Sequence, residues 1–370
     1  MNWMPSRSFA ERYDNLLAIG GHPAVDMPPH VVEAATRAAE RPSYAPTLGL
    51  PALREAIAER HGTNADCVLI TVGGMQALYL VAQVHGARTV SHAPAFFFPQ
   101  VVEAAGGTCA VAYDWDEYAA AIDAGTTLAI VNTPVNPTGY VFREHDLDAI
   151  ATALAGRDPL LVSDEAYFGL TYDGLEHLSP ASHPALHDRT LVLRSFSKTH
   201  AMAAWRVGYA VGPQDAIAEL ARVFAWQALA VDGVAQAEAL AALTGPQEWI
   251  EAARAELAEM RPRAIAAANA SGKLRAALPE GAAFVWAAID GDEDAWSDRL
   301  ARGHGITALP GRHFAAKTPH LRIPFGGRPE AREALLAGLA KLQYEDQIAS
   351  NAAGSSGSSQ HAATWSLRSR

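Results

Sequence analysis

"TLVLRSFSKTHAMAAWRVG" (residues 190–208) joins an apolar run to Lys198, the first lysine of the chain. Residues 190–196 have the composition of a buried strand, so we expect Ser197 and Lys198 to lie where that strand ends. Only four of the 29 basic residues are lysines. A lysine amine can lose its proton when it is desolvated and can then attack a carbonyl carbon, whereas a guanidinium stays protonated. The stretch therefore predicts a nucleophilic lysine, against the alternative of a solvated surface lysine.

The chain around this stretch alternates short apolar runs with helix-like segments from about residue 67 to 212. Such alternation predicts a mostly parallel sheet between helices, with ligands beyond the carboxyl ends of its strands. The candidate strands lie in "DCVLITVGG", "ARTVSHAP", "TLAIVNTP", "PLLVSDEAY", "TLVLRSF" and "YAVG". Long alanine-rich helices follow residue 215, and then a smaller α/β part with candidate strands in "AAFVWAAI" and "HLRIPF".

The fold class is therefore α/β, with a large domain built on a mostly parallel sheet and a smaller C-terminal α/β domain. We expect an N-terminal segment (1–30) that joins the small domain, a large ligand-binding domain (31–235) and a small domain (236–345). The final stretch (346–370) is polar, rich in Gly and Ser and non-periodic, which is typical of a disordered tail.

The composition of the 370 residues, 49% hydrophobic and 19% charged, is that of an ordinary globular protein. A net charge of −11 argues against nucleic acid or an anionic membrane as the main partner. Two cysteines, no apolar signal core and no apolar span of membrane length favour the cytoplasm. The fourteen histidines lack metal-ligand spacing, so we expect no metal site.

Polar groups at the expected strand ends complement one another. Gly73 and Gly74 form a strand-to-helix turn that favours an anion, although a simple tight turn is the alternative. Ser195 and Arg206 could bind the same anion. Asp164 follows an apolar strand, where a carboxylate needs a cationic partner.

Two further stretches supply a donor and aromatic rings. The rigid loop "NTPVNPTGY" (132–140) leaves the Asn136 amide pointing outward, and three adjacent phenylalanines (96–98) cannot all face one core. One ligand would use all of these groups, because it carries a phosphate, a protonated ring nitrogen, a phenolic oxygen and an aldehyde. That ligand is pyridoxal 5′-phosphate.

The sequence resembles the fold type I pyridoxal-phosphate enzymes, specifically the class I/II aminotransferases of the aspartate aminotransferase superfamily, over roughly residues 15–342. The resemblance rests on "LAIGGHPAVDMPPHVVEAA", "SYAPTLGLPALREAIAER", "TVGGMQALYL", "NTPVNPTGY", "SDEAY", "SFSKTHAMAAWRVGYAVG" and "LRIPF". It implies a homodimer that moves an amino group between an L-amino acid and a 2-oxo acid.

The resemblance also assigns roles to residues. Lys198 would form the Schiff base with the cofactor and shuttle the proton, and Asp164 would pair with the pyridinium nitrogen. The remaining cofactor contacts would be Asn136 and Tyr167 at the ring oxygen, Gly73, Gly74, Met75, Ser195 and Arg206 at the phosphate, and Phe96 (or Phe97) stacked on the ring. Tyr44 would reach the phosphate of the partner subunit, Arg322 would bind the substrate α-carboxylate, and Gly20 lies in the loop beside it.

Other functions remain possible on the same scaffold. A lyase, a decarboxylase or an oxidase would share the cofactor residues and break a different Cα bond. A transcription regulator would need an added DNA-binding domain, for which the stretch before "LAIGG" is too short.

The substrate preference follows from the distribution of arginines. Residues 224–243 contain neither arginine nor lysine, which predicts neutral or aromatic donors. The alternative is that Arg312 swings in to bind an acidic side chain.

Overall fold

The computed structural model describes residues 21–40 and 42–355, so Gly20 lies outside the described residues. Its larger sheet has seven strands in the order β1-β7-β6-β5-β4-β2-β3. The strands are β1 (Val68–Thr71), β2 (Arg88–His92), β3 (Thr108–Ala112), β4 (Leu128–Asn132), β5 (Leu160–Asp164), β6 (Thr190–Ser195) and β7 (Gly208–Val211). Neighbouring strands are parallel except at β7, which is antiparallel to both β1 and β6. The predicted mostly parallel sheet is confirmed.

Strand β3 was not among the expected strands. It pairs only with β2 at the edge of the sheet, and its residues alternate between exposed and half-buried until Ala112. An edge strand of this kind lacks the continuous apolar run that marks the central strands.

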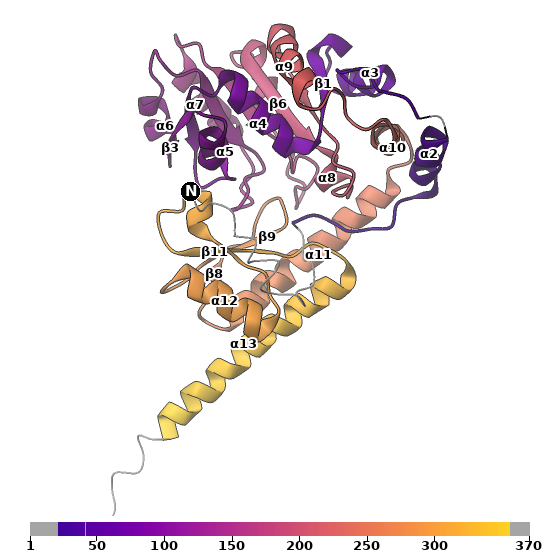
Figure 1. Ribbon diagram of the computed structural model, residues 1–370. Coiled ribbons are helices and arrows are strands. Elements are labelled where there is room, and N and C mark those ends of the chain that lie inside the picture. Colours follow the sequence, from indigo (N-terminus) through magenta and orange to yellow (C-terminus); the bar gives the residue numbers. More distant parts are fainter. Residues whose placement is uncertain (1–20, 41, 356–370) are drawn as a thin grey trace, which may run out of the picture.

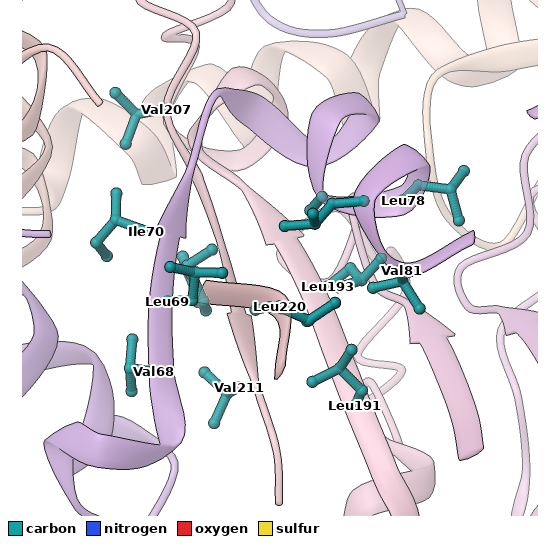
Figure 2. Close-up of a cluster of buried hydrophobic side chains, with 14 of the residues drawn as sticks. Val68, Leu69, Ile70, Leu78, Val81, Leu191, Leu193, Val207, Val211 and Leu220 are labelled. Carbon is teal, nitrogen blue, oxygen red and sulfur yellow. The ribbon is translucent and has the colours of Figure 1, made fainter. Parts of the chain in front are cut away.

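Helices cover both faces of the large sheet. Leu128 and Ile130 of β4 belong to one buried cluster, and Ala129 and Val131 belong to another, because alternate residues of a strand point to opposite faces. The first cluster packs α4 and α9 onto β1, β6 and β7 (Figure 2). The helices of this part are α2 (Pro29–Ala39), α3 (Pro51–Arg60), α4 (Gly73–His85), α5 (Phe98–Ala104), α6 (Trp115–Ala121), α7 (Glu144–Leu154), α8 (Phe196–Thr199), α9 (Gln214–Gln227) and α10 (Gly233–Thr244).

A smaller antiparallel sheet follows, in the order β10-β11-β9-β8. Its strands are β8 (Arg275–Ala276), β9 (Phe284–Ala288), β10 (Leu309–Pro310) and β11 (His320–Pro324), packed with α11 (Glu248–Ala270), α12 (Glu293–His304) and α13 (Pro329–Ser355). Both strands expected in this region are present as β9 and β11. Figure 1 shows the small sheet beside the large one, with the far end of α13 standing away from both.

The expected domain limits stay a prediction, but helix packing can be compared with two of them. Helix α10 packs against α2 and shares the core of the large sheet, although the expected boundary fell at 235. The tail expected from residue 346 begins as helix, since α13 continues to Ser355 through residues such as alanine and glutamine that favour helices. Among the described residues, no helix combines the length and the hydrophobicity needed to span a membrane.

Candidate active site

A cavity of about 310 Å³ lies where β4, β5 and β6 end and the small sheet begins. Its walls include ten of the residues predicted from the sequence, namely Gly74, Met75, Phe96, Asn136, Asp164, Tyr167, Ser195, Lys198, Arg206 and Arg322. The sequence did not point to the other wall residues, which are Gly21, His22, Leu78, Asn132, Ala166, Ser197, Ala203 and Phe284. The cavity therefore gathers groups from both sheets.

Lys198 lies in the short helix α8, directly after β6. Its Nζ lies 5.6 Å from the centre of the Tyr167 ring. Burial above all, and then the nearby charges of Arg322 and Arg206, lower the pKa of Lys198 to about 8 against the opposing effect of Asp164. Far more of the amine is therefore neutral, and hence nucleophilic, near neutral pH than in an exposed lysine.

Asp164 is the last residue of β5, and its Oδ1 accepts a hydrogen bond of 3.1 Å from the backbone N–H of Ala166. No described arginine, lysine or histidine forms an ion pair with it. Burial, together with the charge of Glu165, raises the pKa of Asp164 to about 6 against the opposing effects of that hydrogen bond and of the Lys198 charge. A bound cation beside this carboxyl would stabilise its charged form.

An anion site lies at the first turn of α4. Gly73 has φ of +72°, and a Cβ built there would lie 2.6 Å from Nη2 of Arg206. Arg206 is held by hydrogen bonds from Nη1 to Ser197 Oγ (3.2 Å) and to the Ala203 carbonyl (2.9 Å). The guanidinium, the Ser195 side chain and the N-terminus of α4 thus converge, which suits a phosphate group.

Arg322 of β11 reaches from the small sheet toward the large one. Its Nη1 donates a hydrogen bond of 3.0 Å to Asn136 Oδ1, and its guanidinium lies 4.4 Å from the ring centre of Phe284. Burial lowers the pKa of Arg322 to about 10. Its Nε is buried without a hydrogen-bond partner among the described residues. This arginine is therefore available to a bound carboxylate.

The other predicted residues differ in whether they line the cavity. Phe96 lines the cavity, whereas Phe97 packs on Phe314 at 5.1 Å between ring centres, so the geometry favours Phe96 for ring stacking. Tyr44 is 88% exposed and lies outside the cavity wall. Gly21 takes the wall position next to the predicted Gly20, and a Cβ on Gly21 would lie 2.2 Å from the Phe284 ring.

Glu165, the neighbour of Asp164, was not predicted as a site residue and does not line the cavity. It is fully buried and accepts hydrogen bonds from the side chains of Ser163, Ser179, His177 and Arg194. Burial alone would raise the pKa of Glu165, but Arg194 and His177 hold it far below its usual range.

These groups fit pyridoxal 5′-phosphate. The Lys198 amine complements its aldehyde, and the Asp164 carboxyl complements its ring nitrogen. The anion site at α4 complements its phosphate, and the aromatic wall complements its ring. Arg322 stays free for the carboxylate of a substrate.

Known proteins resemble this chain in sequence and fold. Residues 17–339 match the model of the family described as aminotransferase class I and II. The chain is 34% identical over 344 residues to the aspartate/prephenate aminotransferase of Thermus thermophilus, covering 86% of this chain and 88% of that relative. It is 33% identical over 333 residues to the arginine–pyruvate transaminase of Pseudomonas aeruginosa, covering 83% and 84%. The solved structure of the Thermus thermophilus aspartate aminotransferase with maleate matches with a TM-score of 0.82 at 32% identity, covering 91% of this chain and 94% of that one.

Proposed function

This chain belongs to the class I and II aminotransferase family, and we propose that its cavity transfers amino groups from neutral or aromatic L-amino acids to a 2-oxo acid. The chain is accordingly a pyridoxal-phosphate-dependent transaminase. The observation that carries the residue assignment is the convergence of Lys198, Asp164 and Arg322 on one cavity.

Pyridoxal 5′-phosphate, when bound, supplies an aldehyde that condenses with amines and a protonated ring that withdraws electrons from the donor's Cα. Lys198 would hold it through the amine, and Asp164 would keep the ring nitrogen protonated. Asn136 and Tyr167 would bind the ring oxygen, and Phe96 would pack on the ring. The phosphate would be bound by Gly73, Gly74, Met75, Ser195 and Arg206.

The substrate is oriented by Arg322, which binds its α-carboxylate with charge-assisted hydrogen bonds. Gly21, the neighbour of the predicted Gly20, lines the same cavity and lets the ring of Phe284 pack closely. The Lys198 amine would take the Cα proton of the bound donor as a general base and would deliver it to the cofactor as a general acid.

The donor preference rests on the cations of the cavity wall, which are Lys198, Arg206 and Arg322. Each already has a task in the scheme above. Arg312 is tied to Glu293 (3.3 Å) and Asp294 (2.5 Å), which argues against its swinging in. An acidic donor side chain would therefore meet no free cation among the described wall residues, whereas an apolar one would gain about 25 cal/mol per Å² buried. The two relatives are named for donors as unlike as aspartate and arginine, so the preference must come from this cavity.

The assembly we propose is a homodimer. Large apolar side chains are exposed on α4, at the end of α9 and in the loop before α3, namely Met75, Tyr79, Trp226, Leu229 and Tyr44. A second copy that covers them would bring Tyr44 to the phosphate of its partner. Mixing Lys198→Ala and Tyr44→Phe subunits should then restore activity through hybrid dimers that contain one unmodified site. A fully active monomer in sedimentation would contradict this assembly.

The acidic composition and two free cysteines support a cytoplasmic enzyme.

The test of the reaction uses the holoenzyme and one amino acid with no oxo acid. We expect one equivalent of the 2-oxo acid per subunit, and continued turnover only after 2-oxoglutarate is added. Continuous release of carbon dioxide or ammonia would instead assign the chain to the decarboxylases, lyases or oxidases. In a donor panel, methionine, leucine and phenylalanine should exceed aspartate. An aspartate efficiency more than about tenfold above all three would overturn the preference and point to Arg312.

A further inference from the structure

His22 is a wall residue of the cavity for which the reaction scheme has no use. Its backbone is fixed to the segment after β11, because its carbonyl accepts a hydrogen bond of 2.7 Å from the N–H of Gly327. The next residue, Pro23, forms a parallel bridge with the same glycine. His22 is therefore held firmly at the edge of the cavity.

The His22 ring has a defined tautomer. Its Nδ1 lies 2.7 Å from the carbonyl oxygen of Pro23, and a carbonyl can only accept, so Nδ1 carries the proton. Burial and the charge of Lys198 lower the pKa of His22, and the hydrogen bond to Pro23 opposes them. Because the pKa is lowered overall, the ring is mainly neutral at neutral pH. Nε2 is then a pure acceptor, and it forms no hydrogen bond with any described residue.

The neighbours of His22 place it beside the substrate. Gly21 packs under the ring of Phe284, and Phe284 packs on the guanidinium of Arg322. The α-carboxylate of a donor lies on Arg322 and its Cα lies near Lys198. His22 is then one of the wall residues left to contact the side chain of the donor.

We propose that His22 sets the side-chain specificity, so that the preferred donors are uncharged L-amino acids whose side chain carries an N–H or O–H group. This inference rests on the proposed transamination and refines its substrate class. Glutamine, methionine and glutamate have side chains of similar length, which makes them a matched set. The glutamine amide donates to Nε2, the methionine thioether has no donor, and the glutamate carboxylate turns lone pairs toward the Nε2 lone pair.

The experiment compares kcat/KM for these three donors in the wild-type holoenzyme and in His22→Phe. Wild type should use glutamine at least about tenfold better than glutamate. His22→Phe should lower glutamine use about tenfold and leave methionine within about twofold. His22→Asn, whose amide both accepts and donates, should restore glutamine use and admit glutamate.

His320→Phe is the matched control, because His320 stacks on Trp286 at 4.6 Å between ring centres and does not line the cavity. It should leave all three efficiencies unchanged. An equal loss for glutamine and methionine in His22→Phe would overturn the specificity role and leave transamination intact. No 2-oxo acid from any of the three donors with wild type would instead count against the proposed function.

Discussion

Asp164 and Glu165 are adjacent residues with opposite electrostatic environments. Asp164 lines the cavity without a cationic partner among the described side chains, and its pKa is raised to about 6. Glu165 accepts hydrogen bonds from four side chains, including two contacts of 2.8 and 3.0 Å from Arg194. Its pKa lies far below the usual range because Arg194 and His177 outweigh the effect of burial.

The difference separates two uses of a buried charge. Glu165 ties β5 to β6 through Arg194, one residue before Ser195, and its charge is satisfied within the chain. The charge of Asp164 is left for a ligand to satisfy. Substitution of Glu165 should therefore mainly reduce the stability of the fold, whereas substitution of the residues that line the cavity should mainly reduce catalysis.

The largest loss of catalysis should come from Lys198→Ala, which removes the amine that holds the cofactor and moves the proton. Turnover should fall by at least about ten-thousandfold with the fold retained, measured by product assay and circular dichroism. Lys317→Ala is the control, because Lys317 is an exposed lysine paired with Glu117 at 3.2 Å. Near wild-type turnover in Lys198→Ala would contradict the whole assignment.

Glu165→Gln should mainly destabilise the fold, by about 3–5 kcal/mol in free energy of unfolding, because it leaves Arg194 buried without a counter-charge. The Glu165 pKa is depressed in the folded state, so its stabilising effect is present above the usual glutamate pKa and fades in strong acid. Denaturant titration at neutral and acid pH measures both. If the variant were as stable as wild type but each folded molecule had lost activity, Glu165 would have a catalytic role instead of a structural one.

Arg322→Met should raise the KM for every donor and lower kcat/KM at least about a hundredfold, since it removes two charge-assisted hydrogen bonds. Cofactor binding, followed by visible absorbance, should persist. Arg312→Met is the matched control, and it should leave neutral donors unaffected. Equal losses in the two variants would contradict the separate roles of these arginines.

The smallest effect concerns pH. The rate at which apoprotein captures pyridoxal phosphate should rise as pH increases through about 8, because only the neutral Lys198 amine reacts. Arg322 lowers the pKa of Lys198, so Arg322→Met should move the midpoint toward higher pH. Stopped-flow absorbance measures the profile. A rate independent of pH would contradict the lowered pKa.

Much of this arrangement could be predicted from the sequence because it is local. The central strands are continuous apolar runs, and Asp164, Ser195 and Lys198 stand at or beside their ends. Parallel strands bring these ends to one edge of the sheet, so strand order alone gathers them.

The parts that could not be predicted depend on distant contacts. The partners of Glu165 include Arg194, 29 residues away, and the backbone of His22 is fixed at the cavity by a hydrogen bond from Gly327. Edge strand β3 lacks the apolar run of the central strands. The sequence did contain a signal for Glu165, since a second acid beside Asp164 in "SDEAY" needs partners of its own.

The contrast between the two acids is tested most directly by Asp164→Asn, measured for both half-reaction rate and stability. The half-reaction should slow at least about a hundredfold, a loss of about 2.7 kcal/mol in transition-state stabilisation. Because the pKa of Asp164 is raised in the folded protein, its stabilising effect is fully present at pH values below its pKa in the unfolded chain. That effect is lost as the pH rises through about 6. At neutral pH the apoprotein should therefore be as stable as wild type or more stable, by up to about 3 kcal/mol. An unaffected half-reaction in a destabilised variant would contradict this contrast and make Asp164 a structural residue like Glu165.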